Sequence, residues 1–254
     1  FDIHKSTSVY DNILTENDLY DKYEDPVRLH KKKRRFFECS KELYDQTSKE
    51  HYDKLSGVLL SCEYALAQYS GSAFADINKY LRENDKTHEE MCRNYTESIT
   101  KGINDVGLPE NMILYRGIST PKDILGKDWE SRDIEQLREK FVGKIFRDKG
   151  FCSTSVSEHA AKKFADSYSG TLLKIYAPKG ASGVFMDEFS KHKDKNEKEV
   201  LLQRSSCFKI ISIEPSTTSY GYNIELERIH RRESVCRRGH RLRRNIQKEI
   251  RYLH

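Results

Sequence analysis

The sequence lacks a hydrophobic run that could cross a membrane. Its most apolar stretch, residues 58–66, contains Ser61 and Glu63 and is far shorter than the roughly 20 residues that a transmembrane helix needs. Hydrophobic residues make up 36% of the chain and charged residues 33%, and the mean hydropathy is −0.81. These values indicate a water-soluble protein with a modest core, in which 15 tyrosines and 11 phenylalanines supply much of the buried area.

Metal-binding cysteine pairs are also missing. None of the six cysteines belongs to a C-x-x-C pair, so no zinc site and no other metal is predicted. The even number permits disulfides, but the wide spacing is not that of a disulfide framework. We expect most of them to be small buried hydrophobic residues. The cysteines do not decide whether the protein works in an oxidising or a reducing compartment. The six are Cys39, Cys62, Cys92, Cys152, Cys207 and Cys236.

Charge is distributed unevenly along the chain. The net charge is +5, but residues 228–254 contain ten Arg or Lys and two Glu, so this segment carries +8 and the remainder −3. A second basic run covers residues 31–35. One hypothesis is therefore a nucleic-acid or anionic-membrane binding module, although only Tyr252 offers a ring for base stacking in the tail. The simpler interpretation is a solvated or disordered end.

The chain divides into two halves of different pattern. Apolar residues recur at helical spacing in residues 49–68, 72–82 and 88–103. Beyond residue 111, short β-branched or aromatic segments predict strands at 112–115, 172–177, 184–186, 200–203, 208–214 and 220–226. Two further helices are expected at 132–141 and 157–165, the second capped by Ser157. Helices first and strands later, with little β-α-β alternation, predict an α+β fold.

Three short segments are each common in proteins, but together they indicate one functional site. They are Leu-Tyr-Arg-Gly at 114–117, Phe-Cys-Ser-Thr-Ser at 151–155 and Glu-Lys-Glu-Val-Leu-Leu at 197–202. Arg116 is expected to end one strand, Ser153 to lie near the end of a second, and Glu197 and Glu199 to open a third. Because residues two apart on a strand point to the same face, both carboxylates are expected to project into one site.

The order and context of these segments resemble the Arg–Ser–Glu class of mono-ADP-ribosyltransferases. Further matches are residues 150–151, 171–180, 199–202 and 208–210. The helical residues 69–71 and 77–78 resemble the segment that closes over NAD in the bacterial toxins, which makes the bacterial exoenzyme and effector branch a better match than the vertebrate enzymes. The resemblance covers roughly residues 55–226.

This resemblance implies the ADP-ribosyltransferase fold, with an N-terminal helical half followed by a two-sheet mixed or antiparallel β core. It also implies three parts of the chain. They are an N-terminal extension at residues 1–48, a catalytic domain at 49–228 and a basic C-terminal tail at 229–254.

The resemblance further implies NAD as the substrate and assigns the residues that bind it. A guanidinium holds a pyrophosphate with fixed, charge-assisted geometry, which fits Arg116, and Gly117 leaves room for the backbone to approach the ligand. Tyr69 and Asn78 belong to the helical segment over NAD. Tyr168 is the candidate aromatic for packing on nicotinamide.

The catalytic roles follow from the chemistry of the glycosidic bond. Breaking the nicotinamide–ribose bond develops positive charge, which a carboxylate stabilises mainly in the transition state. By resemblance, Glu199 does this through the ribose 2′-hydroxyl and Ser153 holds Glu199. Thr154 and Ser155 support the sheet and the nucleotide site. The catalytic set is Arg116, Ser153, Glu197 and Glu199.

Glu197 is expected to choose the acceptor. Arginine stays protonated at neutral pH, and a carboxylate can orient its guanidinium and accept a proton as the new bond forms. In the family, Glu at this position goes with arginine acceptors. Phe189 and Asp194 are the other candidates for target recognition. Asp194 stands where the actin-modifying toxins commonly have an aromatic residue, and Gly117 where they often have a second Arg, so actin is not predicted as the target.

The resulting hypothesis is an NAD-dependent transferase that modifies an arginine of a host-cell protein and releases nicotinamide. It implies a monomer without obligatory nucleic acid, secreted or translocated to act in the host cytoplasm. The alternative within the enzyme class is an NAD glycohydrolase that uses water as the acceptor. The alternative from another class is the binding module based on the basic tail.

Overall fold

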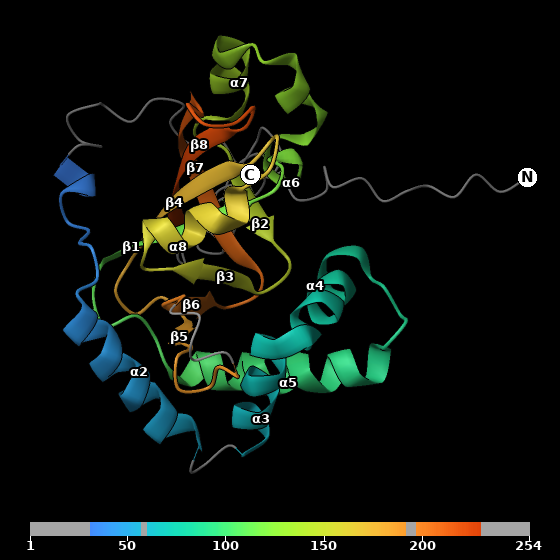
Figure 1. The fold of residues 1–254 in the computed structure, drawn as a ribbon, viewed down its shortest axis with the longest axis vertical. Helices are drawn as coiled ribbons and strands as arrows, with labels where there is room; N and C mark the ends of the chain where they lie inside the picture. Colours follow the sequence, from blue (N-terminus) through green and yellow to red (C-terminus); the bar gives the residue numbers. More distant parts are fainter. Residues whose placement is uncertain (1–30, 57–59, 192–196, 230–254) are drawn as a thin grey trace, which may run out of the picture.

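A helical half precedes the strands, as the sequence predicts (Figure 1). The computed structural model describes residues 31–56, 60–191 and 197–229. The helix expected at 49–68 is divided into two, and the first of them begins at Lys41 and so crosses the predicted boundary after residue 48. The helices are α2 (Lys41–Ser56), α3 (Leu60–Gln68), α4 (Phe74–Glu83) and α5 (Glu89–Asp105).

A short π-helix, η3 (Tyr69–Ala73), connects α3 to α4. Gly71 leaves the helical region there, with φ −86° and ψ −109°, and the chain bends. The bend turns α4 away from α3, so that α4 lies along the ends of the central strands (Figure 1). Helix α4 ends at Asn84, whose left-handed backbone (φ 59°) allows its N–H to bond to Tyr80 O.

Eight strands form one hydrogen-bonded sheet in the order β2-β7-β8-β4-β1-β3-β6-β5. Only β4 and β8 are parallel neighbours among the described strands. The strands are β1 (Met112–Ile118), β2 (Ile145–Asp148), β3 (Cys152–Ser155), β4 (Thr171–Ala177), β5 (Gly183–Phe185), β6 (Glu199–Leu202), β7 (Ser206–Pro215) and β8 (Tyr222–Ile229).

The two sheets that the resemblance implies are joined at one narrow point. Strands β1 and β3 share a single paired position, Tyr115 opposite Ser155, whereas β1 pairs with β4 along seven residues. The α+β class is confirmed, and the sheet has two parts linked at Tyr115. Strand β2 was not predicted, because residues 145–148 follow the helix α7 (Ile134–Phe141) closely and alternate only over four positions.

The two larger hydrophobic clusters of the described chain pack the helices on the sheet. The larger one lies under α7 (Ile134–Phe141) and includes Leu114, Phe141 and Leu226. The second joins the helical half to β5 and β6 through Leu66, Ile77 and Leu201. Because α3, α4 and α5 are fixed to β6 by this second cluster, the helical half is held beside the strand that carries Glu199.

Four short helical segments connect the described strands and were predicted only in part. Ser157 caps α8 (Glu158–Lys162), as predicted, and its hydroxyl accepts from Ala160 N. A 3₁₀ turn, η5 (Lys163–Ala165), continues α8 across the sheet. The others are α6 (Lys122–Leu125) and the 3₁₀ helix η4 (Gly126–Ser131).

The ends of the described chain correct one part of the charge assignment. Arg228 was counted in the basic segment 228–254, but β8 runs to Ile229 and Arg228 is buried within it. The remaining tail lies outside the described residues. Near the other end, Phe36 packs edge-on against Tyr176 of β4. No described helix has the length and apolar character of a membrane span, and five cysteines of the described ranges, all but Cys236, are free thiols.

Candidate active site

A cavity of about 650 Å³ opens where α4 faces β1, β3 and the start of β6. It brings together most of the residues that the sequence singled out. Tyr168 and Phe189 do not line it, and Asp194 lies outside the described residues. The predicted residues on its wall are Tyr69, Asn78, Arg116, Gly117, Ser153, Thr154, Ser155, Glu197 and Glu199.

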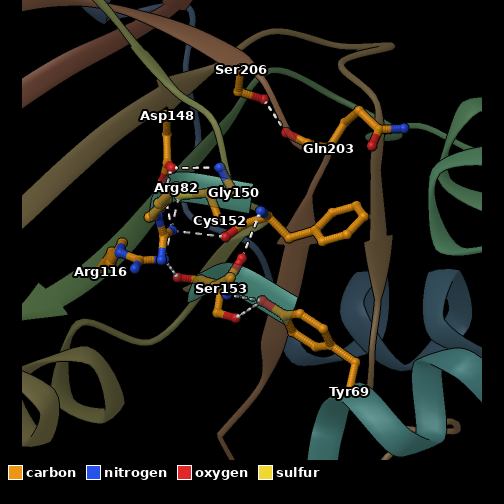
Figure 2. Close-up of polar contacts among 11 residues, drawn as sticks. Tyr69, Arg82, Arg116, Asp148, Gly150, Cys152, Ser153, Gln203 and Ser206 are labelled. Atoms are coloured by element: carbon orange, nitrogen blue, oxygen red, sulfur yellow. Dashed lines mark hydrogen bonds and ion pairs between the residues drawn. The ribbon is translucent and has the colours of Figure 1, made fainter. Parts of the chain in front are cut away.

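Arg116 presents a cation that no carboxylate of the described chain pairs with. Its Nη1 donates to Ser153 O at 3.0 Å and to Cys152 Sγ at 3.6 Å (Figure 2). A backbone carbonyl and a neutral thiol orient the guanidinium without cancelling its charge. The charge therefore remains available to an anionic ligand in the cavity.

Gly117 lines the cavity and also lies directly against the helical segment that follows β3. A Cβ at this position would lie 2.1 Å from Ala161 O and 2.6 Å from Ala165 N. The missing side chain thus lets α8 and η5 pack directly on β1. This packing fixes one wall of the cavity.

Hydrogen bonds connect the helical half to Ser153. Asn78 Nδ2 donates to the Tyr69 hydroxyl at 2.8 Å, and that hydroxyl lies 3.4 Å from Ser153 Oγ (Figure 2). Asn78 Oδ1 accepts from Phe151 N at 2.9 Å. Tyr69 and Asn78 are both buried, so they hold α4 against the start of β3 and leave only part of their surface to the cavity.

An ion pair that the sequence did not reveal supports the same corner. Arg82 makes two contacts of 2.9 Å with the carboxylate of Asp148, and its Nη2 donates to Phe151 O at 3.1 Å (Figure 2). Asp148 also accepts from Gly150 N. The spacing of four residues from Asn78 to Arg82 puts both on one helix face, and this spacing could have identified Arg82.

The environment of Glu199 shifts the pKa of its carboxyl group. Burial raises its pKa to about 7, and the nearby carboxylate of Glu197 contributes in the same direction. A hydrogen bond with Ser153 and the charge of Arg116 act against that rise. A carboxylate with a pKa near neutrality at a cavity wall is a common property of catalytic groups.

Glu197 reaches the same cavity for a reason other than strand alternation. Strand β6 begins at Glu199, and Lys198 between the two acids has a left-handed backbone with φ 48°. The predicted period-two argument therefore does not apply to Glu197. The Ser155 hydroxyl donates to Glu197 O at 2.6 Å and holds the turn, while the Thr154 hydroxyl donates to Val200 O at 2.6 Å.

Lys198 lies on the opposite side of this turn from the cavity residues. Its Nζ contacts Asp45 at 2.9 Å and Asp187 at 3.2 Å, and lies 4.6 Å from the centre of the Tyr44 ring. The Tyr44 hydroxyl donates to Asp187 and, at 2.8 Å, to Glu199 O. These contacts tie α2 to the turn between the two acids, and no pattern in the sequence indicated them.

The profile of the ADP-ribosyltransferase exoenzyme family matches residues 45–231, and so includes every residue of this cavity. The chain belongs to this family. Mono-ADP-ribosyltransferase C3 of Hathewaya limosa is 32% identical over 160 residues, which cover 58% of this chain and 60% of that protein. The chain therefore matches less than two thirds of the length of this relative.

Solved structures agree with the family assignment. The toxin Plx2a of Paenibacillus larvae has a TM-score of 0.63 at 22% identity, over 77% of this chain and 99% of that chain, which shows the shared fold. The ADP-ribosylating toxin BECa of C. perfringens, solved with NADH, has a TM-score of 0.61 at 25% identity over 76% of this chain and 49% of its own.

The roles expected for two aromatic residues, Tyr168 and Phe189, need correction. Tyr168 is 72% exposed and stacks on Tyr220 with ring centroids 4.3 Å apart, outside the cavity. Phe164, four residues earlier, lines the cavity and is 57% exposed. Phe189 is buried among the helices and packs on Tyr52, so it is a core residue and presents no surface to a target.

We expect Lys198→Met to lower kcat about tenfold while the KM for NAD changes less than about threefold. The substitution removes the cation that joins Asp45 and Asp187, which frees the turn between the two acids, but leaves Arg116 intact. A small displacement of catalytic groups is enough for such a loss. Steady-state kinetics with NAD measure both constants.

Two further variants separate positioning from a general loss of stability. Lys198→Arg keeps the charge and should recover most of kcat. Lys162→Met removes an exposed cation that pairs with Glu158 on α8 and should leave both constants unchanged. An unchanged kcat in Lys198→Met would remove Lys198 from this role.

Proposed function

We propose that the chain is an NAD-dependent mono-ADP-ribosyltransferase that modifies an arginine of a host-cell protein and releases nicotinamide. The observation that carries the proposal is the meeting of an unneutralised Arg116 with Glu197 and Glu199 on one cavity wall. Family membership and the name of the C3 relative support the reaction class. We further propose that the protein is secreted or translocated and acts in the host cytoplasm.

In this proposal Arg116 binds the pyrophosphate of NAD. Its guanidinium is oriented by Ser153 O and carries uncancelled charge. Arg82 lies on the same wall but its charge is compensated by Asp148, so it holds the wall rather than competing for the ligand. Phe164 replaces Tyr168 as the aromatic that packs on nicotinamide, because Phe164 lines the cavity.

The reaction begins with cleavage of the bond between the ribose C1′ and the nicotinamide nitrogen. Nicotinamide leaves with the bonding electron pair, and the ribose becomes an oxocarbenium ion. Ionised Glu199, held by Ser153, stabilises that positive charge through the ribose 2′-hydroxyl. A carboxylate fixed in this place acts mainly on the transition state.

Glu197 then accepts a proton from the acceptor arginine. A nitrogen of the target arginine attacks C1′ and forms the new bond, and the guanidinium gives up one proton to the Glu197 carboxylate. The left-handed turn at Lys198 sets this carboxylate beside Glu199 on the cavity wall. If water takes the place of arginine, the same site is an NAD glycohydrolase.

Labelled NAD and a host-cell lysate distinguish these functions. A labelled protein band whose label is released by hydroxylamine treatment typical of arginine adducts supports the proposal. Free ADP-ribose without any labelled band supports the glycohydrolase. If neither product forms, both enzyme hypotheses are rejected.

We expect Arg116→Lys to weaken NAD binding at least about tenfold although the charge is kept. Lysine is a point charge and cannot make the two-pronged contact that a guanidinium makes with a pyrophosphate. Calorimetric titration of NAD measures the dissociation constant. Arg93→Lys on the exposed side of α5 serves as the control, and an unchanged affinity in Arg116→Lys would contradict the pyrophosphate role.

A further inference from the structure

Arg228 is a buried cation for which the described residues provide no partner. It lies on β8 and is only 8% exposed. Its Nε has no hydrogen-bond acceptor, and no ion pair forms with any carboxylate of the described residues. Burial also lowers the pKa of this guanidinium. Because arginine cannot release its proton at physiological pH, the charge stays and requires compensation.

The cost of such an arrangement is large. Taking a guanidinium out of water without an opposite charge destabilises the folded protein strongly, because the net stability of a domain is small. The titratable neighbours of Arg228 are the thiols of Cys152 and Cys207. Burial raises the pKa of Cys152, so this thiol is neutral and compensates nothing.

A small polar cavity of about 140 Å³ opens at Arg228. Its wall is formed by the turn between β6 and β7, the end of β8 and the end of α5, so it is separate from the NAD cavity and shares no lining residue with it. Figure 2 shows Gln203 and Ser206 of this turn linked by a hydrogen bond of 2.5 Å. The polar lining residues are Asn104, Ser182, Gln203, Arg204, Ser205, Ser206 and Arg228.

The lining favours an anion. It contains two arginines, several side chains that can donate hydrogen bonds and no carboxylate. Arg204 lines the cavity and donates from its Nε to the Thr100 hydroxyl at 3.0 Å, and it forms no ion pair with an acidic side chain of the described residues. The volume is well below the roughly 300 Å³ at which pockets for drug-sized ligands begin, so a whole nucleotide does not fit.

We propose that this cavity binds one small tetrahedral oxyanion of the phosphate class, held by the guanidinium of Arg228. Such an anion would lie against Arg228 in the cavity wall and neutralise the buried charge. It would also connect β6, which carries Glu199, to the end of β8. The proposal goes beyond the proposed function and does not depend on it, because none of its tests uses NAD.

Thermal unfolding in sodium phosphate, at ionic strength held constant with NaCl, tests the site. The Tm of the unchanged chain should rise by a few degrees and saturate in the millimolar range. Arg228→Met should lack the saturable rise and should start from a higher Tm without phosphate, because an apolar side chain replaces a buried charge. Arg116→Met, which removes the free cation of the NAD cavity, should keep the rise.

The controls separate a site from a general salt effect. Phosphate stabilises many proteins by exclusion from their surface, but that effect grows steadily and does not saturate. A steady rise of equal slope in the unchanged chain and in Arg228→Met would overturn the proposal. Loss of the rise in Arg116→Met would also overturn it. If Arg228→Met does not fold, Arg228→Gln, which keeps a polar side chain without charge, replaces it with the same expected loss.

Discussion

Replacing Glu199 by Gln should lower both ADP-ribose transfer and NAD hydrolysis by about 10³-fold or more. The carboxylate stabilises charge that appears when the nicotinamide bond breaks, a step common to both reactions, and comparable electrostatic groups contribute this much. The loss should appear in kcat, with the KM for NAD within about threefold. Kinetics with nicotinamide release as the readout measure both constants.

The matched control is Glu97→Gln, which makes the same chemical change on the exposed side of α5. It should leave both activities unchanged. Near-normal hydrolysis in Glu199→Gln would remove Glu199 from the mechanism. Normal transfer with lost hydrolysis would show that the two reactions do not share this step.

The pKa of Glu199 adds a pH dependence to the same prediction. Burial raises this pKa to about 7, and the reaction needs the ionised form. The kcat/KM for hydrolysis should therefore increase about tenfold per pH unit below 7 and level off above it. In Glu199→Gln the residual rate should lose this dependence.

The stability of the folded protein should depend on pH in the opposite direction to kcat/KM. A carboxyl whose folded pKa is raised from 4.5 to about 7 stabilises the folded protein at low pH, and this contribution is lost as pH rises through 7. The shift is equivalent to roughly 3 kcal/mol, reduced because the group borders an open cavity. Glu199→Gln should thus unfold at a higher temperature than the unchanged chain at pH 8, and the difference should vanish toward pH 4.5.

The sequence predicted those parts of the site that depend on short segments. Ser153 and Glu199 lie on strands, as expected from the short segments at 151–155 and 197–202, and Arg116 lies within β1 two residues before its end. The Ser157 cap was also predicted, because a cap depends on a few adjacent residues. Local patterns of this kind retain their meaning without knowledge of the rest of the fold.

Contacts between distant segments could not be derived in this way. Arg82 and Asp148 are 66 positions apart, and Lys198 and Asp45 are 153 apart. Each is one of many charged residues in a chain with 40 acidic and 45 basic side chains, so nothing in the sequence selects the pair. The fold selects it, by placing α4 and α2 against the sheet.

The wrong predictions for the aromatic residues Tyr168 and Phe189 have a related cause. Tyr168, Phe164 and Phe189 all lie in or near polar segments, where composition does not say which ring faces a cavity. The turn of η5 directs Phe164 to the cavity, while the stacking of Tyr168 on Tyr220 keeps it at the surface. Phe189 is drawn into the helical cluster beside Tyr52.

Replacing Glu197 by Gln should separate the two reactions. Transfer to arginine should fall by about 10²-fold or more, whereas NAD hydrolysis should stay within about threefold of the unchanged chain. Glutamine keeps the size and the position that Ser155 fixes through the backbone, but it cannot accept the proton or attract the positive guanidinium. Glu199 and Arg116, which carry out bond cleavage and NAD binding in the proposed reaction, are left in place.

Parallel assays on one preparation measure this separation. Labelled NAD is supplied with a small guanidine acceptor, and the guanidine adduct and free ADP-ribose are quantified together. Glu97→Gln should change neither product. Because Glu197 also contributes to the raised pKa of Glu199, the variant should move the hydrolysis profile toward lower pH. Unchanged arginine transfer would show that another group selects the acceptor, and equal loss of both products would show that Glu197 acts in bond cleavage itself.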